Sequence, residues 1–316
     1  MALDGYTPAS MAKSLGVFLM SVTDTLVRLR PHVVLLAGDR GEQLMAAVAA
    51  AHMNIPVAHV QAGELSGNVD GMTRHAIARY AHLHFAANPD AAERLRRSGE
   101  QEFRIHMTGA PQLDELVNGE LAPPDEVART LGFAPDQPVI VVVQHPVTEE
   151  YGQTATQVRE TLEAVVSFAS HQVLVVFPNN DAGSEDARRT IEHFQGPRLR
   201  VERTLPRRLY VGAMKMAAVM VGNSSSGLIE APVFGLPVVN VGTRQRDRFR
   251  GPNVIDVPAE REAIRAAMAE AMTPAFRERS RHGNPYLSDG GVSRVIVDIL
   301  QRLEIDEKLL KKQIAY

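Results

Sequence analysis

The chain has no cysteine and no long apolar run, and both absences exclude classes of protein. Without cysteine there is no disulfide, no thiolate nucleophile and no zinc site with cysteine ligands. No apolar run approaches the roughly 20 residues that span a bilayer, so we expect no membrane protein. Residues 1–8 lack the basic and apolar regions of a secretory signal, which favours a cytoplasmic location.

The chain also has little net charge. A formal charge of −3 provides no general attraction to nucleic acid, so we expect no nucleic-acid partner. The proportions of hydrophobic (45%) and charged (22%) residues are those of a globular protein. A length of 316 residues is sufficient for two domains, each with its own core.

Short apolar runs alternate with segments of helical periodicity along the whole chain. Apolar side chains three and four residues apart predict an amphipathic helix over 11–30, and Pro31 ends it. The run at 33–37 is too short for a helix and predicts a strand buried on both faces. Further strands are expected at 57–60, 83–87, 105–107, 139–143, 173–177, 199–201, 218–221 and 238–241, and a last long helix near 293–311. This alternation predicts an α/β fold with parallel sheets.

A polar, proline-rich stretch over 113–138 interrupts the alternation. Such stretches mark domain boundaries. We therefore expect an N-terminal domain at 1–122 and a C-terminal domain at 123–316.

Residues 219–241 read as strand, loop, helix and strand. The loop at 222–227 combines glycines with Ser224, Ser225 and Ser226, and its hydroxyl and backbone N–H groups suit a phosphate at the start of a helix. Glu230 lies in the predicted helix, where it can accept hydrogen bonds from ribose hydroxyls. Together these residues predict a site for a nucleoside diphosphate. The alternative is that the serines only cap the helix.

Polar residues also follow the other predicted strands, where ligands of open parallel sheets bind. They are Asp39 and Arg40, then Gln61, Glu64 and Asp70, and in the second half His145, Asn179 and Arg244. Each has another reading as a helix cap, a loop histidine or a surface cation. A metal site is not expected, because no His-x-x-x-His helix and no compact ligand cluster lies near them.

Seven segments that carry these residues resemble the hydrolysing UDP-N-acetylglucosamine 2-epimerases, the bacterial enzymes of sialic-acid-type sugar synthesis and the epimerase half of the animal bifunctional enzyme. The match runs in order from about residue 11 to 295. The segments are GDRGE at 38–42, HVQAGELSGNVD at 59–70, RHAI at 74–77, QHPVT at 144–148, FPNNDAGS at 177–184, GNSSSG at 222–227 and GTRQ at 242–245.

The resemblance implies two Rossmann-like domains of GT-B type, with a UDP-sugar in the cleft and the nucleotide mainly on the C-terminal domain. It implies no cofactor and no metal, and we expect a homodimer or a larger homo-oligomer. It places Ser224 and Ser225 at the diphosphate, Glu230 at the ribose, Asn179 and Arg244 on the nucleotide side, the backbone near Leu205 at uracil, and His145 and Arg40 near the diphosphate. Asp39 and Asp70 fall where the family has acidic residues essential to the sugar chemistry.

The implied activity releases UDP and N-acetylmannosamine from UDP-N-acetylglucosamine. Loss of the C2 proton with departure of UDP gives a glycal, and water then adds with inversion at C2, which requires a base, an acid and a stabiliser of the diphosphate. Asp39, Asp70, Glu64 and His145 are candidates for base and acid. A diacetylbacillosamine analogue is the alternative substrate. A GT-B glycosyltransferase and a non-catalytic nucleotide-sugar-binding protein are the alternative functions.

Two features depart from the family pattern. Gln61 stands where some relatives have a catalytic glutamate, and an amide cannot take a proton as a carboxylate does. The family also opens with a strand and a Gly-Thr-Arg loop that this sequence does not show. We therefore expect about two strand–helix units, roughly 70 residues at about 30 or more per unit, upstream of Met1 in the full gene product. On that expectation the 316-residue chain binds UDP but turns over slowly.

Overall fold

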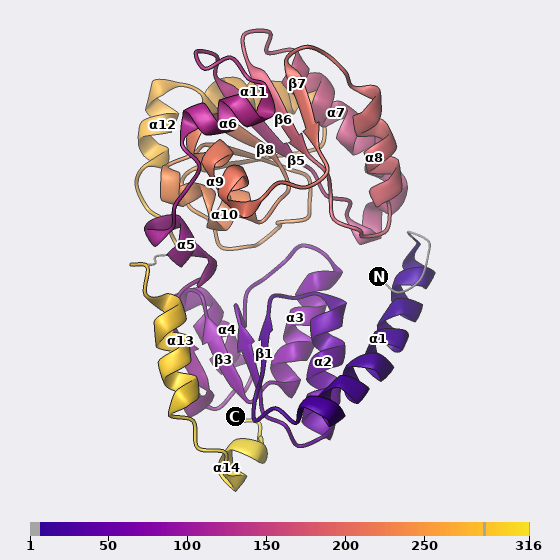
Figure 1. The fold of residues 1–316 in the computed structure, drawn as a ribbon, viewed down its shortest axis with the longest axis vertical. Coiled ribbons are helices and arrows are strands. Elements are labelled where there is room, and N and C mark those ends of the chain that lie inside the picture. The colour runs from indigo at the N-terminus through magenta and orange to yellow at the C-terminus, as the bar shows by residue number, and fades with distance from the viewer. Residues whose placement is uncertain (1–6, 287–288, 316) are drawn as a thin grey trace. The chain divides into compact units, whose positions relative to one another are not determined.

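The computed structural model describes residues 7–286 and 289–315, which form two compact α/β units (Figure 1). Unit 1 consists of the described residues up to Asp114, of Asp247–Phe249 and of those from Tyr286 onward. Unit 2 consists of Glu115–Arg246 and Arg250–Pro285. Each unit contains one parallel sheet, which confirms the predicted fold class.

Unit 1 is built on a four-stranded parallel sheet in the order β1-β2-β3-β4. Its strands are β1 (Val34–Ala37), β2 (Val57–Val60), β3 (Leu83–Ala86) and β4 (Ile105–Met107). Its helices are α1 (Pro8–Leu29), α2 (Gly41–His52), α3 (Val69–Tyr80), α4 (Pro89–Arg97), α13 (Val292–Gln301) and α14 (Glu307–Leu310), with the 3-10 helix η1 (Glu102–Arg104). All four strands and helix α1 were predicted within a few residues.

Strand β1 is less buried than predicted. Every residue of β2 and β3 is buried, whereas Leu35 in the middle of β1 is 50% exposed. The reason is that β1 lies at the edge of the sheet and pairs with β2 alone among the described strands. A run of apolar residues does not distinguish an edge strand from a central one.

The C-terminal residues pack with unit 1, although the sequence groups them with the second domain. Val292 and Ile296 of α13 join the core formed by Ala58 and Phe85. The predicted long helix near 293–311 is in fact two helices, α13 and α14, and Arg104 fixes the second by donating to the carbonyl of Leu309 at 2.9 Å. The amphipathic pattern of α13 predicts a buried face but does not specify which sheet it covers.

Unit 2 is built on a six-stranded parallel sheet in the order β10-β9-β8-β5-β6-β7. Its strands are β5 (Val139–Val143), β6 (Gln172–Val176), β7 (Leu199–Glu202), β8 (Ala217–Gly222), β9 (Val238–Val241) and β10 (Val254–Val257). Only β10 was not predicted. It is a partly exposed edge strand interrupted by Asp256 and so lacks a continuous apolar run.

Helices cover both faces of the second sheet because neighbouring residues of its strands point to opposite sides. On one face Val142 and Val221 pack with α7 (Thr154–Val166), α8 (Ser184–His193) and α11 (Arg261–Ala271). On the other face Val141 and Met220 pack with α6 (Pro124–Leu131), α9 (Arg207–Met216) and the 3-10 helix η3 (Ala231–Phe234). The remaining elements are α5 (Gln112–Asn118), η2 (Thr148–Gln153), α10 (Ser226–Ile229) and α12 (Pro274–Ser280). Of the helices described, none has the length and apolar character that a bilayer crossing requires.

Candidate active site

The centre of the second sheet is a topological switch point. From β5 the chain proceeds to β6 and β7 on one side, and it then returns to add β8, β9 and β10 on the other. The loops after β5 and β8 therefore diverge, which creates a crevice at the carboxyl ends of these two strands. Asn223 joins the two loops, because its Oδ1 accepts from the N–H of His145 at 2.7 Å and its Nδ2 donates to the His145 carbonyl at 2.8 Å.

The close approach of the two loops requires glycine at position 222. Gly222 has φ +126°, in the left-handed region that other residues rarely adopt. A Cβ at this position would lie 2.1 Å from the carbonyl oxygen of Val143. Because glycine has no Cβ, the loops after β5 and β8 can approach closely enough for the Asn223 side chain to contact His145.

The loop at 222–227, which we call the serine loop, does not begin a long helix as the sequence predicts. Helix α10 has only four residues, so Glu230 lies at its C-cap and not within a longer helix. Ser225 occupies the N-cap position, but its side chain makes no capping hydrogen bond. A one-turn helix has only a weak macrodipole. Any anion at this loop would therefore be held by local hydroxyl and N–H groups.

Glu230 is held by an arginine that the sequence analysis missed. The Arg207 guanidinium donates to both carboxylate oxygens of Glu230, at 3.0 and 3.1 Å, and also to Glu115 at 3.2 Å. This bidentate geometry fixes the plane of the Glu230 carboxylate. The signal in the sequence was the position of Arg207, which follows the end of β7 by a few residues like the other polar residues at strand ends.

His145, Asn179 and Arg244 come together with the serine loop. His145 Nδ1 accepts from the backbone N–H of Asn179 at 3.0 Å, so the neutral ring carries its proton on Nε2. Arg244 and Gln245 both donate to the Asn223 carbonyl, at 3.3 and 2.8 Å. Loops after β5, β6, β8 and β9 thus meet at one edge of the sheet, as predicted. Leu205 lies apart from these contacts, partly buried against the core beneath α9.

In unit 1, Asp39 forms an ion pair with a buried arginine. It accepts from Arg74 of α3, whose side chain is 2% exposed, and from Ser66 Oγ at 3.2 Å. Arg74 also donates to the carbonyl of Gln61 at 2.6 Å. Gln61 has φ +59°, which is uncommon for a residue other than glycine. One guanidinium therefore holds the loops that follow β1 and β2.

A second buried pair joins Glu64 to Arg248, a residue that the sequence analysis also missed. Their side chains are 2% and 6% exposed. Arg248 belongs to the short segment Asp247–Phe249 of unit 1, and the neighbouring Tyr286 donates its hydroxyl to the Phe249 carbonyl at 3.0 Å. Glu64 and Arg248 are 184 positions apart, and no local pattern in the sequence predicts such a pair.

Asp70 and Arg40 have different surroundings. Asp70 begins α3 and is 8% exposed, and its Oδ2 accepts from Asn68 Nδ2 at 3.0 Å. Arg40 is the N-cap residue of α2, and its guanidinium lies 3.9 Å from the Glu42 carboxylate, so this pair is a weak one.

His59 is structural. Burial lowers the pKa of His59 to about 3, so the ring is neutral near pH 7. Its Nε2–H donates to the carbonyl of Gly38 at 2.7 Å. The ring therefore fixes the turn that carries Asp39.

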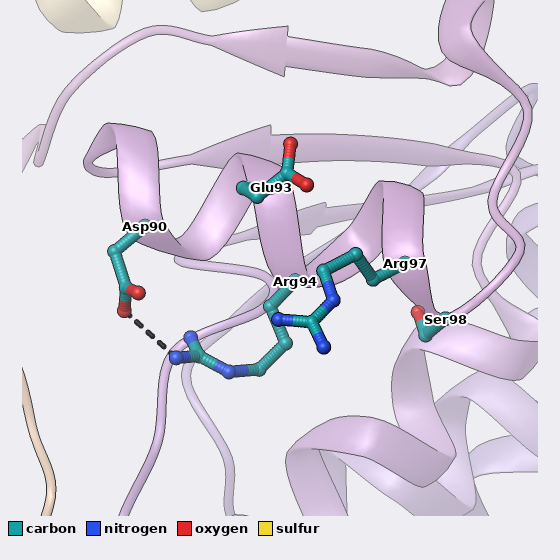
Figure 2. A pocket seen from close by; sticks show the side chains of 5 residues that line it. All are labelled: Asp90, Glu93, Arg94, Arg97 and Ser98. Atoms are coloured by element: carbon teal, nitrogen blue, oxygen red, sulfur yellow. Dashed lines mark hydrogen bonds and ion pairs between the residues drawn. The ribbon is translucent and has the colours of Figure 1, made fainter.

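Helix α4 fixes the loop that carries Glu64. Arg94 donates to the carbonyl of Gly63 at 2.8 Å and pairs with Asp90, also at 2.8 Å (Figure 2). Gly63 has φ +79°, and a Cβ there would lie 2.4 Å from the Ala91 carbonyl. The pocket in Figure 2 is lined by Asp90, Glu93, Arg94, Arg97 and Ser98, none of which was a predicted site residue.

Two units, each with a parallel sheet and polar loops at its strand ends, define a ligand-binding protein of Rossmann-like architecture. The family model described as UDP-N-acetylglucosamine 2-epimerase matches residues 1–301. The chain belongs to the UDP-N-acetylglucosamine 2-epimerase family.

Relatives and solved structures agree with this assignment. The chain is 39% identical over 309 residues to a UDP-N,N'-diacetylbacillosamine 2-epimerase (hydrolyzing) of Legionella pneumophila, covering 98% of the chain and 81% of the relative. It is 33% identical to a UDP-N-acetylglucosamine 2-epimerase of Neisseria meningitidis, covering 83% and 69%. The crystal structure of the UDP-GlcNAc 2-epimerase from Neisseria meningitidis bound to UDP-GlcNAc shares the fold, with a TM-score of 0.79, 19% identity and coverage of 96% and 84%.

Proposed function

We propose that the chain is a hydrolysing UDP-sugar 2-epimerase that acts on an N-acetylated UDP-sugar. One observation carries the proposal: a chain of this family combines a hydroxyl-rich loop at a switch point with the buried carboxylates of Glu64 and Asp70, which follow a strand of its other sheet. The proposed substrate is UDP-N-acetylglucosamine, and the products are UDP and N-acetylmannosamine. The name of the Neisseria meningitidis relative supports this substrate.

UDP-N,N'-diacetylbacillosamine is the second candidate substrate. It is favoured by one observation, the 39% identity over 98% of the chain to the Legionella pneumophila protein with that name. Both sugars carry an N-acetyl group at C2, so the same elimination chemistry applies to both. Competition between the two UDP-sugars in one assay measures the ratio of their kcat/KM values and decides between them.

Unit 2 would hold the nucleotide. Ser224 and Ser225 would donate to the diphosphate, and donors fixed at the leaving group stabilise the charge that develops as UDP departs. Each Glu230 oxygen has two lone pairs and Arg207 uses one of each, so the carboxylate retains acceptor sites for the ribose hydroxyls. The other residues in this proposed assignment are Ser226, His145, Asn179 and Arg244, with the backbone near Leu205 at uracil and Arg40 of unit 1 near the diphosphate.

Unit 1 would supply the base and the acid. The base removes the C2 proton while the bond from C1 to the UDP oxygen breaks, and the glycal forms. Water then adds its oxygen to C1, and a proton is delivered to C2 on the opposite face. Asp39, Glu64 and Asp70 are the carboxylates proposed for these transfers. Gln61 cannot perform them, because an amide side chain does not take up a proton near pH 7.

Incubation with UDP-N-acetylglucosamine in D₂O tests the proposal. We expect release of UDP together with N-acetylmannosamine that carries deuterium at C2, because the elimination loses the original proton to solvent. Accumulation of UDP-N-acetylmannosamine would show a non-hydrolysing epimerase instead. UDP release that requires an added acceptor would show a glycosyltransferase, and binding without release would show a non-catalytic protein.

A further inference from the structure

A row of three hydroxyl groups leads from α9 into the serine loop of unit 2. The hydroxyl oxygen of Tyr210 lies 2.7 Å from Ser226 Oγ, and Ser226 Oγ lies 2.9 Å from Ser224 Oγ. The backbone N–H of Ser226 also donates to Ser224 Oγ, at 3.4 Å. Ser225 takes no part in this row, and its hydroxyl makes no hydrogen bond within the described part of the chain.

The direction of the protons along this row follows from counting donors and acceptors. Within the described residues, the Tyr210 hydroxyl reaches only the loop hydroxyls, Ser226 and more weakly Ser224. The Tyr210 side chain is only partly buried, but its phenol is the more acidic hydroxyl and so the better donor, which makes Tyr210 the donor into the loop. Ser226 then accepts from Tyr210, and the acceptor for its own proton among the described residues is Ser224 Oγ. The protons therefore run from Tyr210 to Ser226 and from Ser226 to Ser224.

With the protons in this direction, the Ser224 hydroxyl can donate to a group outside the row. A serine oxygen has two lone pairs. In Ser224 one lone pair accepts the N–H of Ser226 and the other accepts the Ser226 hydroxyl. The Ser224 proton is then available only to a group outside the row, and a phosphate oxygen is a pure acceptor.

We propose that Tyr210 is a positioning residue for the diphosphate, because it heads a hydrogen-bonded row that holds the Ser224 hydroxyl as a donor to the phosphate. The inference rests on the proposed function. It separates the roles of the three serines: Ser224 and Ser225 contact the phosphate, whereas Ser226 transmits the orientation set by Tyr210. Burial raises the pKa of Tyr210, so its phenol keeps its proton across the physiological range.

The test is Tyr210→Phe, which keeps the ring and removes only the hydroxyl. UDP and uridine are titrated separately into the wild-type and variant chains, with affinity measured by calorimetry or ligand-observed NMR. We expect the affinity for UDP to fall about three- to tenfold, because Ser226 and Ser224 can then reverse and direct the Ser224 proton away from the phosphate. The affinity for uridine should not change. Tyr80→Phe, an identical change at the end of α3 in unit 1, is the control and should alter neither affinity.

A second variant tests the same row of hydroxyl groups without changing Tyr210. Ser226→Ala removes the middle of the row and should cause a similar selective loss of UDP affinity. In the Ser226→Ala background, Tyr210→Phe should have a much smaller further effect, since the phenol then keeps only its weaker direct contact with Ser224. A merely structural role of Tyr210 would not produce this coupling.

The outcomes separate the inference from the function on which it rests. Equal losses for UDP and uridine, additive effects of the two substitutions, or no loss in Tyr210→Phe would each overturn the role of Tyr210 while wild-type UDP binding stands. Failure of the wild-type chain to bind UDP would overturn the proposed function, and the inference with it.

Discussion

Two of the three candidate carboxylates of unit 1 pair with a buried guanidinium. Asp39 faces the buried guanidinium of Arg74, and Glu64 faces that of Arg248. Asp70 accepts from the neutral amide of Asn68. A substitution of Asp70 therefore leaves Asp39 and Glu64 each with its arginine partner.

Asp70→Asn should remove turnover and leave nucleotide binding intact. The amide is isosteric but cannot act as base or acid, so we expect kcat to fall on the order of 10²- to 10⁴-fold. Affinity for UDP, which we assign to unit 2, should stay within a factor of about two. Both are measured on the same preparation by a UDP-release assay and by calorimetry. Asp24→Asn on the exposed face of α1 is the control. Loss of UDP binding in Asp70→Asn would refute its assignment to the sugar chemistry.

Arg248→Met should destabilise the chain by removing the counter-charge of Glu64. We expect a loss of about 3–5 kcal/mol in the free energy of unfolding, measured with denaturant, because a buried carboxylate is left unpaired. Adding Glu64→Gln should restore part of this loss. Arg261→Met breaks an exposed pair with Glu163 of 3.3 Å and should cost less than about 1 kcal/mol. If Arg248→Met and Arg261→Met lowered the free energy of unfolding equally, the buried pair would contribute no more to stability than the exposed one.

Sequence reasoning identified candidate site residues that follow strands and missed the residues that contact them. Asp39, His145 and Asn179 lie within three residues of a strand's end, so their positions predict that they gather at a sheet edge. Arg74 lies within a helix, and Arg248 lies in a segment that returns to unit 1 from between β9 and β10. Their roles depend on tertiary contacts across 35 and 184 positions. No local periodicity carries that information.

At the scale of elements, the site in unit 2 depends on how closely β5 and β8 approach each other. Gly222→Ala should place a methyl group against the Val143 carbonyl in a strained backbone conformation. We expect a loss of about 2 kcal/mol or more in unfolding free energy, together with weaker UDP binding, because Asn223 would lose its register with His145. Denaturant titration and calorimetry measure the two effects.

Gly16→Ala is the matched control for Gly222→Ala. Gly16 lies within α1, and a Cβ added there would meet no other atom within 4 Å. The substitution should raise the unfolding free energy by about 0.5–1 kcal/mol, since alanine is the better helix former. If Gly222→Ala were equally well tolerated, the close approach of β5 and β8 would not be a requirement of the fold.

The elements of the fold were predictable to different degrees. Central strands such as β2 and β5 were predicted with correct bounds, because a short continuous run of apolar residues indicates burial on both faces. Edge strands were predicted less well: the bounds of β1, β4 and β7 were close, but β1 was expected to be fully buried, and β10 was missed. The break between α13 and α14 was also missed. Long-range contacts such as that of Arg104 with Leu309 fix this part of the chain, and local propensity does not reveal them.

At the scale of the whole molecule, the two units differ in their buried histidines. In unit 1, burial lowers the pKa of His59 to about 3 and that of His82 to about 4, and it also lowers the pKa of His84. His82 Nδ1 accepts from the Val57 N–H at 3.1 Å, a bond that requires the neutral ring. In unit 2, burial lowers the pKa of His171, which is only partly buried.

This difference predicts that unit 1 opens first in acid. Below about pH 6.5, histidines in the unfolded chain bind protons, whereas His59 and His82 of folded unit 1 stay neutral. The free energy of unfolding therefore falls by about 1.4 kcal/mol for each histidine with every pH unit of acidification. The loss extends down to their folded pKa values of about 3 and about 4. Hydrogen exchange from pH 7 to 4, corrected for intrinsic rates, should show β2 and β3 losing protection before β5 and β8. His82→Asn keeps an acceptor without the titration and should delay this loss, whereas the exposed His282→Asn should not. Earlier or simultaneous opening of unit 2 would contradict the prediction.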